Sequence, residues 1–282
     1  MPELPEVETI ARGLASRVSG DVIESVWLGQ KPEPLKSTAR EIAATLEHAR
    51  IATVRRVGKH IVFDLEQNGV GRTQGSVRPI QAHPTPAQWI VHLGMTGRLQ
   101  VCEPKSELLK HTHAILKLAS GRELRFVDPR RFGRLSVTRG FEAAGIEPLK
   151  ADLDRFLGLF RGRKTPIKTA LLNQKLLSGV GNIYADESLF RAGIRPRRRA
   201  STITRAQLAK LLSSVKEVLK EAIALGGSSI SDYVDTDGEA GFFQLQHRVY
   251  GREGEPCLVC KNRVKRIVIA GRSSHYCAKC QK

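Results

Sequence analysis

The sequence predicts an α+β protein of several domains: an N-terminal helix with a β-sandwich, then a helical domain, then a short hairpin that contains cysteines. Three observations support this prediction. The chain has 282 residues, more than one ordinary core needs. Short apolar runs dominate up to about residue 140, whereas a helical period follows. Four of the five cysteines lie after residue 256. We therefore expect domains at residues 1–140, 150–240 and 248–282.

The N-terminal domain is predicted to begin with a helix. Pro5 suits a first helical turn, and Val7, Ile10 and Leu14 share one face. A helix over Ala39–His48 and a long surface loop over Gln67–Gln88 are also expected. The other apolar runs are short, as the strands of a sandwich or barrel are; they cover residues 22–28, 51–57, 61–65, 89–93, 99–101, 114–118, 123–127 and 133–137.

Helical periodicity governs the second domain. Apolar positions predict a helix near residues 153–160, and Thr165-Pro166 is expected to supply the N-cap and first position of the next helix. A glycine-containing turn at residues 177–182 separates that helix from one over Ile183–Ala192. Thr204 and Gln207 form a capping box that opens a long amphipathic helix, which ends before Gly226-Gly227.

Charge points to a polyanionic partner. Lys and Arg number 46 against 28 Asp and Glu, so the net charge is +18 and the isoelectric point is near 10.1. Each Lys or Arg that pairs with a phosphate releases counterions, which favours nucleic acid. The start, with three Glu and two Pro, differs from a signal peptide, and no run approaches the ~18 apolar residues of a spanning helix. We expect a cytoplasmic monomer, associated with the nucleoid through DNA and not with a membrane.

The C-terminal cysteines have the spacing of a zinc site. Cys257 and Cys260 form one C-x2-C pair, and Cys277 and Cys280 form the other after 16 residues. Paired thiolates at tight turns supply four tetrahedral ligands, so one structural Zn²⁺ is expected; two disulfides are the alternative. Cys102 is expected to be a small core residue. Residues 251–282 carry eight Lys or Arg against two Glu, on what is expected to be a hairpin turning at Gly271.

The N-terminus is a candidate nucleophile. A small second residue permits removal of Met1, which would expose the secondary amine of Pro2. An α-amino group has a pKa of about 7.7–8.0, so more of it is unprotonated near neutrality than of a lysine. Glu3 and Glu6 flank this amine and could act as a general acid and an orienting carboxylate. An acidic start to a helix is the alternative interpretation.

Five motifs in order along the whole chain resemble bacterial formamidopyrimidine-DNA glycosylase, also called DNA-(apurinic or apyrimidinic site) lyase. The resemblance implies a bifunctional base-excision repair enzyme that removes oxidised purines, such as 8-oxoguanine and formamidopyrimidines, and cleaves the strand by β,δ-elimination. It also implies a helix-two-turns-helix domain with a zinc finger. The motifs are Met1–Thr9, His92–Gly97, Asp128–Gly133, Gly179–Ala185 and the four-cysteine module.

The resemblance also implies catalytic roles. It makes Pro2 the Schiff-base nucleophile and Glu3 the proton donor, with Glu6 as the second carboxylate. Lys59 corresponds to the family's essential lysine, the acid of β-elimination. Without the family, Lys59 would be a surface lysine at a strand end. Arg272 corresponds to the arginine of the finger that contacts phosphate near the lesion and takes part in δ-elimination.

DNA contacts form a second set of implied roles. Met95, Arg130 and Phe132 correspond to residues that fill the gap left by a flipped-out nucleotide, and their chemistry suits an emptied base site. Without the resemblance to the family, Met95 and Phe132 would be expected in the core. The resemblance also implies backbone contacts, where Asn182 could equally be an N-cap; they involve His111, Lys164, Lys168 and Asn182.

Some features depart from the family pattern. Asn173 stands where Asp is usual, Ser229 replaces a frequent Thr, and the loop over Gln67–Gln88 is longer than usual. Two other functions stay open at this stage. One is a DNA-binding protein without catalysis, which the set of Pro2, Glu3, Glu6 and Lys59 argues against. The other is the sister endonuclease VIII-like activity on oxidised pyrimidines, which Leu4 disfavours because that enzyme usually begins Pro-Glu-Gly-Pro.

Overall fold

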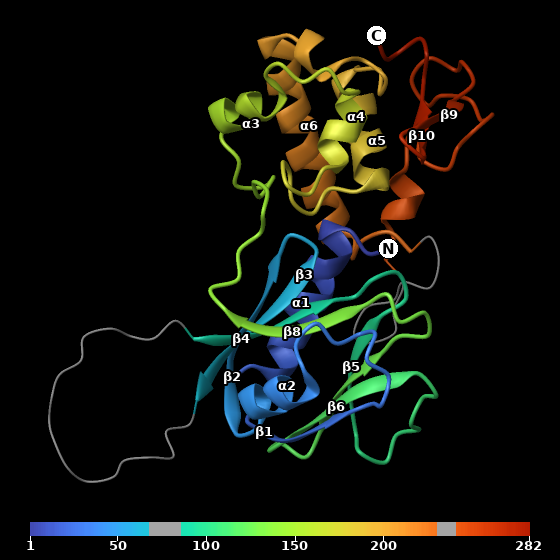
Figure 1. Cartoon of the computed structure of the whole chain (residues 1–282). Helices are drawn as coiled ribbons and strands as arrows, with labels where there is room; N and C mark the ends of the chain where they lie inside the picture. The colour runs from blue at the N-terminus through green and yellow to red at the C-terminus, as the bar shows by residue number, and fades with distance from the viewer. Residues whose placement is uncertain (68–85, 230–240) are drawn as a thin grey trace, which may run out of the picture.

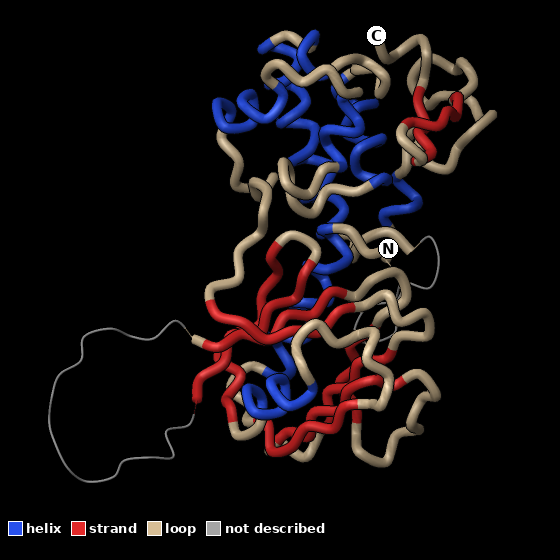
Figure 2. Tube along the Cα trace, in the orientation of Figure 1, coloured by secondary structure: helices blue, strands red, loops and turns tan. Residues whose placement is uncertain are grey.

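A computed structural model describes residues 1–67, 86–229 and 241–282, and it shows two halves joined by one linker (Figure 1). The lower half is mostly strands and the upper half mostly helices (Figure 2). This matches the predicted change in periodicity. The predicted loop over Gln67–Gln88 lies almost entirely outside the described residues.

The N-terminal half is a sandwich of two antiparallel sheets. One sheet has the strand order β2-β3-β4-β8 and the other β1-β6-β7-β5. Apolar residues of both inner faces form one core, which α1 and α2 complete. The elements are α1 (Leu4–Val18), β1 (Ile23–Leu28), α2 (Ala39–Leu46), β2 (Ala49–Val57), β3 (His60–Gln67), β4 (Ala87–His92), β5 (Arg98–Cys102), β6 (Thr112–Leu118), β7 (Glu123–Val127) and β8 (Arg134–Arg139).

The C-terminal half packs helices around a second core and adds a small hairpin. The amphipathic stripe of α6 lies at the centre of that core. The elements are α3 (Leu153–Phe160), α4 (Ile167–Leu172), α5 (Asn182–Ala192), the 3-10 turn η1 (Ala200–Thr202), α6 (Arg205–Ala224), the 3-10 turn η2 (Phe243–Gln246), β9 (Lys265–Ile269) and β10 (Arg272–Tyr276). None of the described helices is long and apolar enough to cross a membrane.

Helix α1 connects the two cores. Val7, Ile10 and Leu14 are buried in the sandwich, as predicted, whereas Leu4 is buried in the helical core. The backbone N–H of Leu4 donates to the carbonyl of Gly179 at 3.0 Å. The first residues of the chain are therefore fixed at the junction of the two halves, where the N-terminus is seen in Figure 1.

Helix ends account for the differences from the predicted elements. Helix α4 begins at Ile167 with Pro166 as its N-cap, so the prediction of Thr165 as N-cap was wrong by one residue. Proline has no N–H and a fixed φ, and here Pro166 takes the non-helical N-cap position and not the first helical position. Helix α2 ends at Leu46, because His48 takes a left-handed φ of 63°. The capping box of Thr204 and Gln207 is confirmed.

Candidate active site and nucleic-acid interface

Four distant parts of the chain meet in one cavity of about 780 Å³ at the junction of the two halves. Glu3 comes from the N-terminus, Lys59 from the β2–β3 turn, Asn182 from the start of α5 and Arg272 from the start of β10. Met1 lies at the same cavity. The sequence-based set of Glu3, Lys59 and Arg272 is thus brought together in space.

Glu3 is a buried carboxyl group that faces the cavity. It is 5% exposed, and its Oε1 accepts the backbone N–H of Ile183 at 3.1 Å. A Cβ at Gly181 would stand 2.2 Å from the Glu3 carboxyl carbon, so only glycine fits there. The pKa of Glu3 is raised to about 7, mainly by burial; nearby Lys59 opposes this rise, and the charge of Glu6 contributes to it. Near neutral pH this group can both give and take a proton.

Glu6 lies behind Glu3 rather than at the cavity. Its Oε2 accepts the backbone N–H of Glu3 at 2.8 Å, and its Oε1 accepts the N–H of Ser228 at 2.8 Å and the hydroxyl of Tyr184. Burial raises the pKa of Glu6, and these donors oppose the rise. The geometry favours a role in holding the N-terminus over the direct catalytic role predicted from the sequence.

Lys59 is presented by a two-residue hairpin between β2 and β3. Gly58 has a φ of 60°, which a tight turn requires and glycine adopts at little cost. Lys59 is 7% exposed, and burial lowers its pKa, while Glu3 and Glu6 raise it and Arg272 lowers it. A buried amine with a depressed pKa releases its proton more readily than a surface lysine does.

Arg272 stands at the tip of the β9–β10 hairpin. Ala270 and Gly271 form the turn, with φ values of 47° and 75°, and Arg272 pairs with Ile269. The Arg272 side chain is exposed at the cavity. An exposed guanidinium at this place is suited to a phosphate.

Lys168 and Asn182 lie beneath this hairpin. Lys168 is fully buried, and its Nζ contacts the carboxylate of Asp186 at 2.7 Å and donates to the carbonyl of Ser273 at 2.6 Å. The structure therefore gives Lys168 protein partners in place of the predicted phosphate. Asn182 follows the N-cap Gly181, so it is not itself the cap, and its Nδ2 donates to Ser273 Oγ at 3.3 Å.

Met95, Arg130 and Phe132 form a second cluster on two adjoining loops of the sandwich half. Met95 is 44% and Phe132 52% exposed, and the Arg130 guanidinium lies 4.8 Å from the centre of the Phe132 ring. The two loops touch, because a Cβ at Gly94 would stand 2.5 Å from the Phe132 carbonyl carbon. Neither Met95 nor Phe132 is a core residue, so the alternative interpretation was wrong.

Asp128 fixes these loops, a role that sequence reasoning missed. It is fully buried, accepts the Thr96 hydroxyl at 2.6 Å and accepts the N–H of Gly133 at 2.7 Å. Its own N–H donates to the carbonyl of His111 at 2.9 Å, while the His111 side chain is exposed. In the sequence, the signal for this role was a single Asp that follows a buried strand and precedes Pro-Arg-Arg.

The four predicted cysteines lie together. Their Sγ atoms are all within 4.8 Å of one another, with Cys260 and Cys277 at 3.4 Å and Cys257 and Cys280 at 3.9 Å. Tetrahedral ligands at about 2.3 Å from Zn²⁺ would be roughly 3.8 Å apart, so the cluster fits one ion. All four are free cysteines, which excludes the two disulfides. Four thiolates leave no position for a water, so the zinc is structural.

Two acids of α5 attach the zinc hairpin and were not predicted either. Asp186 accepts Ser274 Oγ at 2.9 Å and the N–H of His275 at 2.8 Å. Glu187 accepts three consecutive backbone N–H groups of residues 248–250 at 2.8–3.0 Å. Two adjacent acids within a helix that is otherwise mostly buried were the available signal for such anchors.

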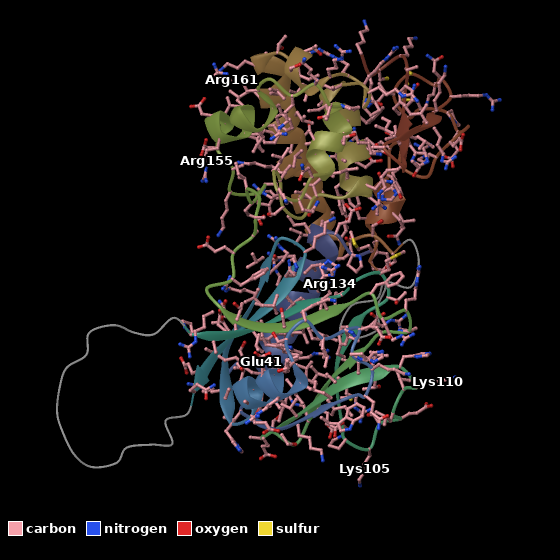
Figure 3. All side chains as sticks on the ribbon, in the orientation of Figure 1. Glu41, Lys105, Lys110, Arg134, Arg155 and Arg161 are labelled. Carbon is pink, nitrogen blue, oxygen red and sulfur yellow. The ribbon has the colours of Figure 1, made fainter. Side chains whose placement is uncertain are left out.

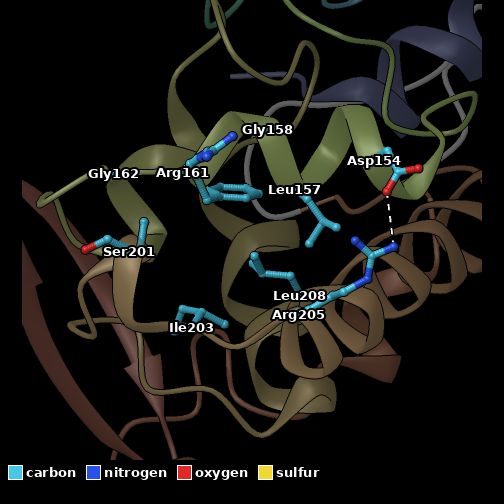
Figure 4. A pocket seen from close by; sticks show the side chains of 11 residues that line it. Asp154, Leu157, Gly158, Arg161, Gly162, Ser201, Ile203, Arg205 and Leu208 are labelled. Atoms are coloured by element: carbon cyan, nitrogen blue, oxygen red, sulfur yellow. Dashed lines mark hydrogen bonds and ion pairs between the residues drawn. The ribbon is translucent and has the colours of Figure 1, made fainter.

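Basic side chains extend from both halves of the molecule, such as Arg155 and Arg161 in the helical half and Lys105 and Lys110 in the sandwich half (Figure 3). Lys164 and His111 are also exposed. A second, open cavity of about 440 Å³ lies between α3, η1 and α6 (Figure 4). An ion pair between Asp154 and Arg205 at 3.1 Å crosses one side of it. No residue of the Glu3, Lys59 and Arg272 set lines this cavity, so it is separate from the candidate site.

The fold and the site define a zinc-finger protein of two halves whose N-terminus lies at a cavity that Glu3, Lys59 and Arg272 also line. Three family models match the chain: the formamidopyrimidine-DNA glycosylase N-terminal domain at residues 1–135, its H2TH domain at 144–234, and a zinc finger found in FPG and IleRS at 254–282. The chain belongs to the formamidopyrimidine-DNA glycosylase family and is an enzyme of that family. The predicted helix-two-turns-helix domain and zinc finger are confirmed.

Individual relatives match over the full length. Formamidopyrimidine-DNA glycosylase of Solibacter usitatus is 42% identical over 100% of both chains, and so is that of Dechloromonas aromatica. The crystal structure of MutM (Fpg) from Thermus thermophilus is 40% identical, with a TM-score of 0.83 over 99% of this chain and 98% of that one. Lactococcus lactis Fpg with DNA containing an abasic site is 30% identical, with a TM-score of 0.85 over 99% of both.

Proposed function

We propose that this enzyme removes oxidised purines, including 8-oxoguanine and formamidopyrimidines, from double-stranded DNA in the cytoplasm and cleaves the resulting abasic site by β,δ-elimination. The main supporting observation is Glu3, a carboxyl group with a pKa near 7 that lies beside Pro2 in a cavity shared with Lys59 and Arg272. Solved relatives from Lactococcus lactis are complexes with DNA containing Fapy-dG or an abasic site.

The nucleophile is the amine of Pro2 after removal of Met1. Its lone pair attacks C1′ of the damaged nucleotide, the bond from C1′ to the base breaks, and the electron pair of that bond leaves with the base. The proton that the attacking nitrogen loses balances the proton that the departing base takes up. Opening of the sugar breaks the C1′–O4′ bond and leaves an iminium ion between Pro2 and C1′. While Met1 is present it lines the same cavity, so its removal also makes room for the sugar.

Glu3 supplies a proton to the sugar oxygen as the ring opens. Its pKa near 7 keeps a large fraction protonated at neutral pH, whereas an ordinary glutamate would be ionised. Lys59 places a cation beside the developing charge and donates a proton during β-elimination. Because burial lowers its pKa, that donation costs less than it would from an exposed lysine.

Arg272 binds the phosphate next to the lesion, where δ-elimination releases the strand. Asn182, which lines the cavity, and the exposed His111 and Lys164 contact the DNA backbone. Lys168 supports this set from below, since its Nζ holds the hairpin that carries Arg272. These contacts orient the duplex and do not read its sequence.

Met95, Arg130 and Phe132 fill the space that the flipped nucleotide leaves. Two exposed apolar side chains on one rigid pair of loops are unfavourable in water, and stacking between bases would bury them. The guanidinium over the Phe132 ring can donate hydrogen bonds to the base left unpaired.

The proposal is tested by trapping the iminium with borohydride on matched duplexes that carry an oxidised purine or an oxidised pyrimidine. Hydride reduces the iminium to a stable amine, so a covalent protein–DNA product forms only if the amine reacted. We expect trapping on the purine duplex and at most a weak signal on the pyrimidine duplex. The reverse preference would identify the sister activity.

A variant with one alanine inserted between Met1 and Pro2 is the matched control. Its Pro2 nitrogen is an amide and cannot form an iminium, while every phosphate contact is kept. We expect no trapped product and a duplex affinity within about twofold of the parent. Trapping at the native rate by a protein that retains the extra residue in mass spectrometry would exclude Pro2, and Lys59 would become the candidate nucleophile.

A further inference from the structure

His247 is a buried imidazole that the proposed reaction does not use. It follows η2, is 8% exposed, and its ring packs between those of Phe243 and Tyr250, with centroid distances of 5.5 and 5.6 Å. Its Nε2 lies 3.1 Å from the Oγ of Ser228. An apolar side chain would fill this space equally well, so packing alone does not explain a polar ring here.

Ser228 lies on the path from His247 to the N-terminus. Its backbone N–H donates to Glu6 Oε1 at 2.8 Å, and Glu6 Oε2 accepts the backbone N–H of Glu3 at 2.8 Å. Gly227, with a φ of 86°, packs directly on Glu6, because a Cβ there would stand 2.9 Å from Glu6 Cγ. A short series of hydrogen bonds thus connects His247 with the residue next to Pro2.

Two backbone segments hold this arrangement, which we call the clasp: residues 225–229 and 241–247. Phe243 N–H donates to the carbonyl of Gly227 at 2.9 Å, and Gly241 N–H donates to Ser229 Oγ at 2.8 Å. Ser229 N–H donates to Gln244 Oε1 at 2.9 Å. Among the described residues of the clasp, His247 contacts the side chain of Ser228, the residue whose N–H reaches Glu6.

We propose that His247 is a positioning residue for the reaction of Pro2: by its hydrogen bond it fixes Ser228, whose N–H fixes Glu6, which in turn fixes Glu3 and the adjoining amine. This inference rests on the proposed function. Burial lowers the pKa of His247 to about 4, so the ring is neutral at pH 7 and keeps one donor and one acceptor nitrogen. Misplacement of a reacting group by a fraction of an ångström slows the chemistry more than it weakens binding.

The test compares His247→Leu, which keeps most of the ring's volume, with His247→Gln, whose amide can still hydrogen-bond to Ser228. Trapping by borohydride is followed under single turnover with saturating duplex, and duplex affinity and thermal unfolding are measured in parallel. We expect His247→Leu to trap about five- to tenfold more slowly with its affinity within twofold of the parent. His247→Gln should recover to within about twofold of the parent rate.

Ser228→Ala removes the partner hydroxyl and keeps the N–H that reaches Glu6. It should slow trapping as His247→Leu does, and the double variant should be no slower than either single one. Ser228→Ala also tests the inference if His247→Leu fails to fold. Amide hydrogen exchange at Ser228, measured on the protein alone, should be faster in both single variants.

Several outcomes would overturn the inference. They are a native trapping rate in His247→Leu, equal slowing in His247→Gln, additive losses in the double variant, or a loss of affinity that accounts for the slower trapping. Failure of the proposed function is recognised separately, because then the unmodified protein forms no trapped product either.

Discussion

Two pairs of buried acids differ in what surrounds them. Glu3 and Glu6 lie at the start of α1, and Asp186 and Glu187 lie within α5; all four are at most 5% exposed. Burial raises the pKa of Glu3, Glu6 and Glu187 alike. A raised pKa therefore does not by itself identify a catalytic acid.

Hydrogen-bond satisfaction separates Glu3 from the other three acids, since Glu6 accepts three donors as well. Glu187 accepts three backbone N–H groups, and Asp186 accepts Ser274 and His275 and contacts Lys168. Glu3, in contrast, lines the cavity and has one buried oxygen, Oε2, with no hydrogen-bond partner among the described residues. Fully satisfied acids attach the hairpin, while the acid with spare acceptor capacity is available to a substrate.

Glu3→Gln tests this comparison with the largest expected effect. The amide keeps the shape of the side chain but cannot transfer the proton, so base removal should slow at least about a hundredfold. Single-turnover cleavage of an oxidised-purine duplex measures this rate. Duplex affinity should stay within about threefold, and a native rate would place the proton donor elsewhere.

Asp186→Asn should act on stability instead. The amide can keep contacts to Ser274 and His275 but leaves the buried charge of Lys168 without its partner, at a cost of about 3–5 kcal/mol. Denaturant unfolding of the helical half measures the loss. The exposed Glu24→Gln is the control and should change the free energy of unfolding by less than about 0.5 kcal/mol. Equal effects of the two changes would show that the ion pair contributes little.

The pH dependence of stability should distinguish Glu3 as well. Its pKa is about 7 in the fold against 4.5 in the unfolded chain, so between these values the folded state binds more protons. Stability therefore falls as pH rises through this window, by up to ~3 kcal/mol from Glu3. Glu3→Gln should remove that part of the slope and be more stable than the parent at pH 8. Thermal unfolding at pH 5 and pH 8 measures it, and an unchanged slope would contradict the raised pKa.

The smallest expected effects come from comparing an exposed lysine, Lys164, with a buried one, Lys168. Lys164 is exposed, so Lys164→Ala should reduce the slope of log affinity against log salt by roughly 0.9 without changing stability. Lys168 is buried against Asp186, so Lys168→Ala should lower stability and leave that slope nearly unchanged. Affinities for damaged and undamaged duplex at several salt concentrations measure the slopes. A loss of slope in Lys168→Ala would mean that its charge reaches a phosphate in the complex.

Sequence reasoning succeeded where the signal is local or periodic. The alternating runs located the strands, the capping box located α6, and cysteine spacing located the zinc site. It missed Asp128, Asp186 and Glu187, because a buried acid is identified by donors that come from distant segments. The N-cap of α4 was misplaced, and the burial of Lys168 was not foreseen, for the same reason: neither backbone pairing nor burial is visible in a short stretch of residues.

The cavity is the least local feature of the chain, since Glu3 and Arg272 reach it from opposite ends of the sequence. Contacts between distant residues form late in folding, because the entropy of closing the loop is lost before they contribute. Each half has its own core and can become compact earlier. A newly made chain should therefore acquire its reactive centre last, and heating should abolish strand cleavage before either half unfolds. An incompletely folded copy would then carry a free amine but no assembled means of cutting DNA.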